Sequence, residues 1–297
     1  MTPRGIGPAT TSNRSIAASC RAKGLILHVP VSKAEALELL PKGFSLMPIE
    51  GVPADEHLLR FDFAELSGGK GSLAGIDSHQ VTRGLGSVVG AVWGAMFLNP
   101  KLGAKIGSAI AGAAAQAGSH AFRYEELIVT VPNVVAEGGK TPYQFVTGMR
   151  LNSLLGQKLE QLAGYGYHKE QADLHADTFT QYTVREGRNT VFAADVSNVD
   201  RWSDGNHPQF DLVNELGRQP FLGQLDNGEF ALSQMSRTYD AMARAQVDLE
   251  ANGVVKGLGE TRFVSPARQA LGASGAFVFN DADTRLTWPT RTPRSQL

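Results

Sequence analysis

Short runs in which apolar and polar residues alternate recur along this chain, and this period of two constrains its fold more than any other feature. Leu59, Phe61 and Phe63 alternate with Arg60 and Asp62, which predicts a strand with one buried face and one solvent-facing face. Further strands are predicted at 24–29, 127–131, 144–149, 179–184 and 191–196. No strand–helix alternation recurs that could build a parallel sheet, so the sequence predicts a largely antiparallel α+β fold.

Two later segments also have strand patterns. Residues 239–250 are rich in alanine, which favours a helix, but their apolar and polar residues alternate strictly, which favours a strand. We interpret this segment as a strand. Near the end of the chain, 275–279 and 285–288 are expected to form a closing hairpin around the polar residues 280–283.

Helices are expected at two places between the strands. Ser32 and Glu35 have the spacing of a capping box, which predicts a helix over 32–40 that Pro41 ends. Leucines at 155, 159 and 162 form one stripe in a helix predicted over 152–164.

Residues 84–118 are unusually rich in glycine and alanine. Small residues recur every four positions on both sides of Asn99 and Pro100, which predicts two helices with closely packed faces. The first apolar run, 84–98, is shorter than the ~20 residues that span a bilayer. We therefore expect 83–118 to be a helical insertion in one domain, and contact of 84–118 with a membrane is the alternative.

Charge and cysteine content limit the partners and the setting of the protein. The chain has 28 Lys and Arg against 29 Asp and Glu, so nucleic acid and anionic membrane surfaces are not expected partners. Cys20 is the only cysteine, which excludes an internal disulfide and fits a reducing, cytoplasmic setting. Residues 1–21 are predicted to be a flexible arm, and 22–297 a single domain. The scattered histidines predict no metal site.

One segment combines residues that could carry chemistry. Residues 164–170 read Gly-Tyr-Gly-Tyr-His-Lys-Glu, whereas Walker A, dinucleotide-binding and nucleophile-elbow motifs do not occur. An amine becomes a nucleophile only when its pKa is lowered, because a protonated ammonium has no lone pair. From these residues alone, Lys169 is either such an amine or a surface lysine on a turn.

The order of motifs around Lys169 resembles that of the acetoacetate decarboxylase superfamily. Members carry Tyr-x-Glu before an apolar strand, then a helix, and then Gly-Tyr/Phe-Pro-Lys. This chain has Tyr124-Glu125-Glu126 before Leu-Ile-Val, a helical pattern over 152–164, and Tyr167-His168-Lys169. The resemblance covers roughly residues 22–290 and is interrupted by the insertion at 83–118.

The resemblance implies a closed, mostly antiparallel β-barrel or cone with peripheral helices, assembled into homo-oligomers. It also implies a pocket lysine that condenses with a substrate ketone and needs no metal or organic cofactor. By position, Lys169 is the Schiff-base candidate and Glu126 matches a glutamate that manages protons. The residues that would line the substrate pocket are Tyr124, Tyr165, Tyr167 and His168.

Two departures bear on the function. His168 stands where the family has proline, and Glu170 stands where the decarboxylases carry a second lysine. A carboxylate facing the amine would raise its pKa, although neighbouring side chains on an extended segment point apart. We expect a lysine-dependent lyase that acts on a small keto acid or related carbonyl compound. The alternative is a non-catalytic protein of the same fold that binds a small apolar molecule or a lipid.

Overall fold

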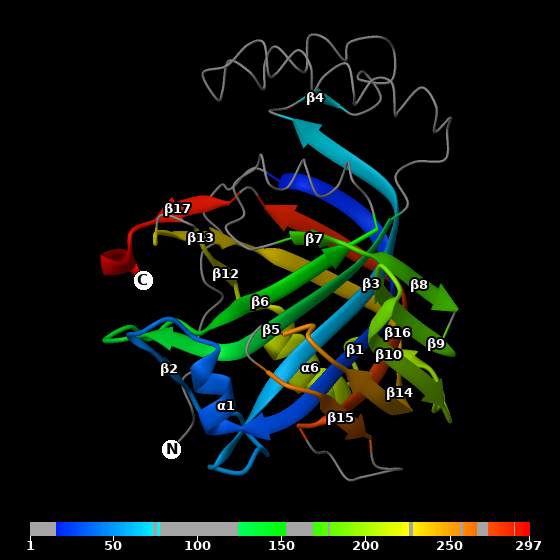
Figure 1. The fold of residues 1–297 in the computed structure, drawn as a ribbon. Coiled ribbons are helices and arrows are strands. Elements are labelled where there is room, and N and C mark those ends of the chain that lie inside the picture. Colours follow the sequence, from blue (N-terminus) through cyan, green and yellow to red (C-terminus); the bar gives the residue numbers. More distant parts are fainter. Residues whose placement is uncertain are drawn as a thin grey trace, which may run out of the picture.

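Most of the described chain forms β-strands in this computed structural model of the protein (Figure 1). The structure describes residues 16–73, 76–77, 124–152, 169–177, 179–225, 228–255, 258–265, 273–287 and 289–297. The strands of the main sheet are β1 (Ile16–Ser32), β2 (Phe44–Leu46), β3 (Glu56–Leu73), β5 (Tyr124–Ala136), β6 (Tyr143–Leu151), β7 (Lys169–Gln171), β11 (Ser203–Asp204), β12 (Phe221–Gln224), β13 (Phe230–Ser233), β14 (Met235–Ala251), β16 (Gly275–Thr287) and β17 (Thr290–Thr292).

A smaller layer extends from the far half of β14. Its strands are β8 (Asp173–Asp177), β9 (Gln181–Glu186), β10 (Asn189–Ser197) and β15 (Thr261–Val264). They pair in the order β8–β9–β10–β14–β15, all antiparallel. Strand β4 (Ile76–Asp77) pairs with the end of β3.

The central strands pair in the order β6–β5–β3–β1–β16–β14, and every pair is antiparallel. Only β7 and β12 lie parallel to their neighbour β6. The predicted predominance of antiparallel strands is confirmed, and the described helices are few and short. Within the described ranges no pairing joins β14 back to β6, although β12 pairs with both β6 and β13, and β13 leads into β14 through Gln234. The closed barrel therefore stays a prediction.

The structure describes short helices between the strands. They are α1 (Lys33–Glu38), η2 (Pro208–Phe210), α6 (Asp211–Gly217) and η3 (Arg294–Gln296). The capping box is confirmed, because the Ser32 hydroxyl accepts from the Glu35 amide at 3.2 Å and the Glu35 carboxylate accepts from the Ser32 amide at 2.9 Å. Among the helices that the structure describes, none has the length and apolar character to cross a membrane.

Most predicted strands are confirmed, with changed ends. The patterns at 127–131, 144–149, 191–196 and 239–250 lie in β5, β6, β10 and β14, and 179–184 overlaps β9. Strand β1 runs on through Pro30, where the prediction ended it. Pairing with β16 stops at His28, so β1 is an edge strand at Pro30 and no partner needs the missing N–H. Strand β1 also begins at Ile16, so residues 16–21 of the predicted arm belong to it.

The predicted closing hairpin is wrong. Strand β16 runs without a turn through the polar residues, and it contains a β-bulge in which Asn280 and Asp281 oppose the single residue Lys23 of β1. Asp281 has a φ of 58°, a left-handed conformation that aspartate tolerates better than most residues. Turns and bulges use the same residue types, so this sequence pattern alone does not distinguish one from the other.

The central sheet is buried on both faces, and the two faces differ in chemistry. The apolar face packs against the β8–β10 layer, including Phe192 of β10, and consists of Leu25, Leu27, Leu59, Phe61, Phe63, Leu127, Val129 and Val278. The opposite, polar face combines hydrophobic residues such as Ile26 and Phe279 with charged ones, and Phe210 and Val213 pack on it. Arg60 and Asp62, predicted to face solvent, are each 3% exposed on this polar face.

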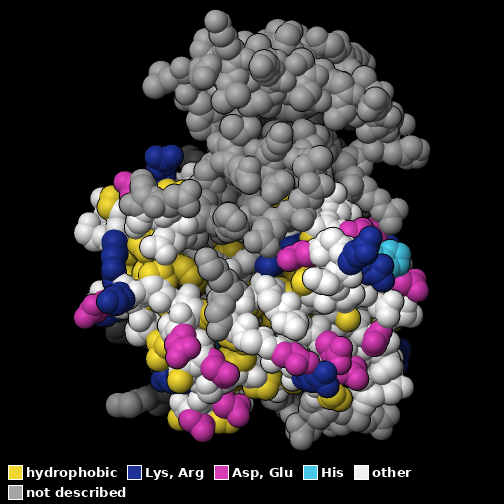
Figure 2. Space-filling model, in the orientation of Figure 1, with side chains coloured by type: hydrophobic (Ala, Val, Ile, Leu, Met, Phe, Trp, Pro, Cys, Tyr) yellow, Lys and Arg dark blue, Asp and Glu magenta, His cyan; other side chains and the backbone are white. Residues whose placement is uncertain are grey.

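On the described part of the face shown in Figure 2, basic and acidic side chains are interspersed. The helical insertion predicted at 83–118 and residues 153–164 of the helix predicted over 152–164 lie outside the described residues.

Candidate functional site

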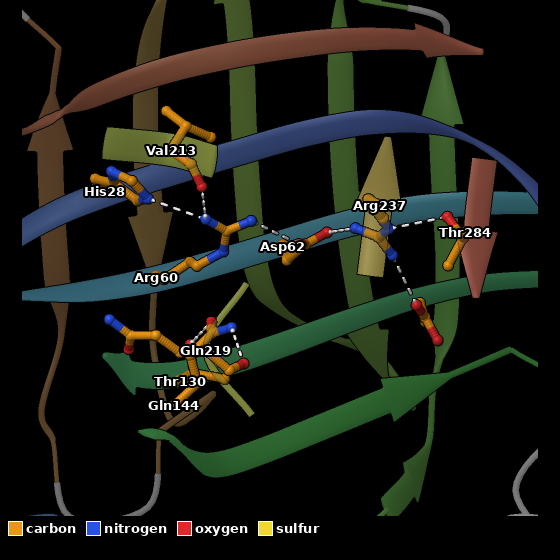
Figure 3. A network of polar contacts seen from close by, with 10 residues as sticks. His28, Arg60, Asp62, Thr130, Gln144, Val213, Gln219, Arg237 and Thr284 are labelled. Carbon is orange, nitrogen blue, oxygen red and sulfur yellow. Dashed lines mark hydrogen bonds and ion pairs between the residues drawn. The ribbon is translucent and has the colours of Figure 1, made fainter. Parts of the chain in front are cut away.

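Five buried ionisable side chains form a continuous row along the polar face of the sheet. They are His28, Arg60, Asp62, Arg237 and Glu126; His28 is fully buried, and the side chains of the four charged residues are 3–5% exposed. Figure 3 shows His28, Arg60, Asp62 and Arg237 in this order, with Thr284 beside Arg237. The candidate site is built around this row.

Strand register brings these residues together from distant parts of the sequence. His28 on β1 pairs with Arg60 on β3, and Asp62 follows on the same face because side chains alternate along a strand. Glu126 on β5 pairs with Ala64 of β3, one step further along that face. Arg237 comes from β14 on the other side of the sheet.

One end of the row is a neutral histidine. Arg60 donates through Nη1 to the Val213 carbonyl at 3.1 Å, and the same nitrogen lies 3.4 Å from His28 Nε2. His28 Nδ1 lies 3.2 Å from the Ala273 carbonyl, so the tautomer protonated at Nδ1 satisfies both contacts. Complete burial, with Arg60 adding to it, lowers the pKa of His28 to about 3, and the ring is therefore uncharged at neutral pH.

Arg237 is the centre of the row. Its Nη1 donates to Asp62, its Nη2 donates to Glu126 Oε1 at 3.1 Å, and its Nε donates to Thr284 Oγ1 at 3.2 Å. The guanidinium also lies 5.5 Å from the centre of the Phe279 ring. Burial opposes the charge, but Asp62 and Glu126 outweigh it, so the pKa of Arg237 is raised.

Asp62 joins the two arginines. Its Oδ2 accepts from Arg60 at 3.3 Å, and its Oδ1 accepts from Arg237. Burial would raise the pKa of Asp62, but the charges of Arg237 and Arg60 outweigh burial and hold that pKa below its ordinary value. The row thus contains two cations and two anions in contact, which is the condition under which buried charges are tolerated.

The backbone of Lys169 lies on a strand close to this row. Lys169 begins β7 and pairs with Met149 of β6, which pairs with Ile128 of β5. Glu126 lies two residues from Ile128 along β5. The side chains of Lys169 and Tyr124 lie outside the described part of the structure, as do residues Tyr165, Tyr167 and His168 entirely.

Sequence reasoning missed most of the row. The sequence does place Arg60 and Asp62 on one face of a strand, because they alternate with phenylalanines. This alternation does not indicate that other residues bury that face. Arg237 lies in no motif and is 111 residues from Glu126 in the sequence. Only the folded sheet brings the two together.

Cys20 on β1 is a further neighbour of the row. The pKa of its thiol is raised to about 12, because burial and, to a smaller extent, the Glu126 carboxylate outweigh the opposing charge of Arg237. Within the described ranges, no group of three or more His, Cys, Asp or Glu could hold a metal ion. What this site offers is an anchored carboxylate in a largely dry environment, which can orient a cation or exchange a proton.

Solved structures share this fold. The chain is similar to an acetoacetate decarboxylase from Legionella pneumophila, with 11% identity and a TM-score of 0.55, covering 97% of this chain and 92% of that one. An acetoacetate decarboxylase-like enzyme from Sphingomonas wittichii has 13% identity and a TM-score of 0.55, covering 97% of both chains. Neither a family model nor a curated protein matches the sequence.

A third similar structure contains a ligand. It is the enduracididine biosynthesis enzyme MppR, complexed with the condensation product of pyruvate and imidazole 4-carboxaldehyde. This structure has 13% identity and a TM-score of 0.55, covering 98% of this chain and 99% of that one. At such low identity these likenesses show the fold alone. The predicted resemblance to the acetoacetate decarboxylase superfamily is thus confirmed at the level of the fold.

Proposed function

We propose that this protein is a lysine-dependent, decarboxylase-like lyase that forms a Schiff base between Lys169 and a small keto acid or related carbonyl compound. The observation that carries the proposal is the position of the Lys169 backbone on β7, two strands from the strand of the buried, Arg237-bound Glu126, on the fold of acetoacetate decarboxylase. The activity of the structural neighbours supports the reaction class but does not by itself assign it.

Strand geometry supports a meeting of Lys169 and Glu126. Residues that pair across neighbouring strands share a face, so Lys169, Met149 and Ile128 belong to one row of the polar face. Glu126 lies two strand spacings from Lys169 and two residues further along β5 than Ile128, so about 12 Å separates the two backbones. Lysine and glutamate side chains together can bridge such a gap. The proposal therefore directs the Lys169 amine toward Glu126.

The chemistry follows from a neutral amine in this position. The Lys169 nitrogen adds to the substrate carbonyl, and loss of water leaves a cationic iminium. When a carboxylate lies β to that carbon, its C–C bond breaks, carbon dioxide leaves, and the bonding electrons form an enamine. The enamine carbon then takes a proton, and water releases the product and restores the amine. Glu126 is the proposed group that moves protons between these steps.

Several finer expectations belong to the same proposal. They are a barrel closed through β12 and β13, a pocket lined by Tyr124, Tyr165, Tyr167 and His168, a homo-oligomeric assembly and a cytoplasmic setting. The complex of MppR with pyruvate makes pyruvate a sensible first probe.

Borohydride trapping tests the function. The protein is reduced in the presence of pyruvate, acetoacetate and other carbonyl compounds, and mass spectrometry locates the adduct. We expect a mass gain on the peptide that contains Lys169, no gain in Lys169→Ala, and an unchanged gain in Lys140→Ala, which removes an exposed lysine. An adduct that survives Lys169→Ala, or no adduct with any compound, would contradict the proposal.

A second candidate function is binding without catalysis. It is favoured by His168 and Glu170, which replace the proline and second lysine of the decarboxylases. The ligand would be a small apolar molecule or a lipid held near Tyr165 and Tyr167. A metabolite that co-purifies with the protein and is retained by Lys169→Ala would favour this function over the first.

A further inference from the structure

The proposed site contains an electrostatic conflict. A buried carboxylate near an amine favours the protonated amine, which cannot attack a carbonyl. Glu126 is such a carboxylate, since it is 3% exposed and the proposed function directs the Lys169 amine toward it. The second lysine that could oppose this effect is replaced by Glu170. A fixed positive charge must therefore come from elsewhere in the fold.

Arg237 is placed to supply that charge. Its Nη2 is 3.1 Å from Glu126 Oε1, and the side chain is 3% exposed, so little solvent screens the pair. Asp62 and Thr284 hold the other nitrogens of the same guanidinium, which fixes its orientation. All three guanidinium nitrogens of Arg237 donate hydrogen bonds, so this side chain can hold Glu126 in a fixed position.

We infer that Arg237 is a positioning residue that keeps Glu126 as an oriented anion and offsets its charge, so that the amine of Lys169 stays unprotonated without a second lysine. This inference rests on the proposed Schiff-base function. In the decarboxylase pattern, a second lysine directly after the reactive one supplies the positive charge. Here Arg237 of β14 takes that electrostatic role.

The charged groups around Arg237 come from every strand packed against it. Glu126 faces it from β5, Asp62 from β3 with Arg60 behind, and Tyr239 is its neighbour on β14. Among the described residues, the Cys20 thiol of β1 and the Thr284 hydroxyl of β16 also lie near the pair. Among the described side chains of the row, the positive charges of Arg60 and Arg237 equal the negative charges of Asp62 and Glu126.

The pKa of the neighbouring Cys20 thiol is consistent with this role of the Glu126–Arg237 pair. The carboxylate of Glu126 raises the pKa of Cys20 and the guanidinium of Arg237 lowers it. The two members of the pair thus act in opposite directions on a third group nearby. The same opposition is expected at the Lys169 amine.

The test measures the protonation of Lys169 without using a substrate. Acetic anhydride acetylates only unprotonated amines, so the extent of labelling of the Lys169 peptide against pH gives the midpoint of its titration. The variants are Arg237→Met, which removes the charge, Arg237→Lys, which keeps it, and Glu126→Gln, which removes the anion. Arg244→Met is the matched control, because Arg244 is also on β14 and lies 5.3 Å from a phenylalanine ring centre.

In Arg237→Met the labelling midpoint should rise by about one pH unit, the lower end of what one nearby charge produces. Arg237→Lys should restore most of that shift, and Arg244→Met should leave the midpoint where it is. A folded Arg237→Met with an unmoved midpoint overturns the inference. If Arg237→Met does not fold, Glu126→Gln decides: a lowered midpoint supports the inference and an unmoved one overturns it.

The same proteins are reduced with borohydride in the presence of pyruvate and the other carbonyl compounds, which separates this inference from the proposed function. If labelling responds as expected but no compound forms an adduct, the Schiff-base function fails and the electrostatic role of Arg237 stands. If the adduct forms with an identical pH profile in wild type and Arg237→Met, the function stands and the role of Arg237 is refuted.

Discussion

Both faces of strand β3 are buried, but one is covered by hydrophobic side chains and the other by paired charges. Phe61 and Phe63, each 1% exposed, point into a purely hydrophobic layer, whereas Arg60 and Asp62, each 3% exposed, point into the row of paired charges. Hydrophobic burial stabilises without regard to direction, but buried charges are tolerated only when each finds its partner in one geometry. The apolar face therefore holds the sheet together, and the polar face fixes the positions of specific atoms.

The largest effect that tests this comparison is expected on the apolar face. Phe61 contacts Phe192 with ring centres 5.8 Å apart. Phe61→Ala leaves a cavity and should reduce the free energy of unfolding by about 4 kcal/mol. Urea denaturation measures the loss, and Phe61→Leu, which fills more of the space, should lose much less.

Phe61→Ala should also leave the Lys169 labelling midpoint unchanged as long as the variant is folded. A shift in that midpoint would mean that the two faces are not separable.

Asp62→Asn should produce the next largest effect, because it breaks the row with almost no change in volume. Arg60 and Arg237 would then be buried with no anion between them, and the free energy of unfolding should fall by about 3 kcal/mol. Asp240→Asn is the matched control, because Asp240 pairs with Arg21 but its side chain is 56% exposed. It should cost below about 1 kcal/mol. Equal losses of unfolding free energy in the two variants would show that burial does not make the ion pairs of the row more important for stability.

Local patterns predicted local structure well. The capping box at Ser32 and the strand over 239–250 were correct because both depend on residues within a few positions of each other. The bulge at Asp281 was read as a turn because its energetic support is non-local. The bulge is held by pairing to β1 and β14 on both sides, which the sequence near Asp281 does not encode.

The candidate site was predictable only in part for the same reason. Glu126 was found through a motif that links it to Tyr124 and Lys169 along the chain. Arg237 had no such motif, and its role depends on β14 reaching the polar face from the far side of the sheet. Alternation in β3 marked Arg60 and Asp62 as facing away from the phenylalanines, but alternation cannot show whether solvent or protein lies there.

Acidification should reveal a smaller effect of the row, through His28. Its pKa is about 3 in the folded protein against 6.5 as the ordinary value. Above pH 6.5 the ring is neutral in both states, and below it the unfolded state binds a proton that the folded state excludes. The contribution of His28 to the free energy of unfolding is therefore fully present above pH 6.5. It falls by about 1.4 kcal/mol per pH unit toward pH 3.

Urea denaturation at several pH values checks this expectation for His28. Between pH 6.5 and 5 the wild type should lose about 2 kcal/mol more than His28→Gln does. A His28→Gln slope equal to that of the wild type would show that the ring takes up protons as easily in the folded protein as in the unfolded one.

The smallest expected effect compares the two faces within the single strand β16. Thr284 accepts a hydrogen bond from Arg237 at 3.2 Å on the polar face, whereas Val278 is fully buried in the apolar face. The two residues are an even number of positions apart but face opposite ways, because the bulge at Asp281 shifts the alternation by one. Thr284→Val leaves a buried guanidinium N–H without its acceptor, and Val278→Thr buries a hydroxyl among hydrocarbons. Each should cost about 1 kcal/mol in urea denaturation, although the two exchanges are chemically opposite. If Thr284→Val proves stabilising instead, the row does not depend on complete hydrogen bonding, and the polar face behaves as a second apolar core.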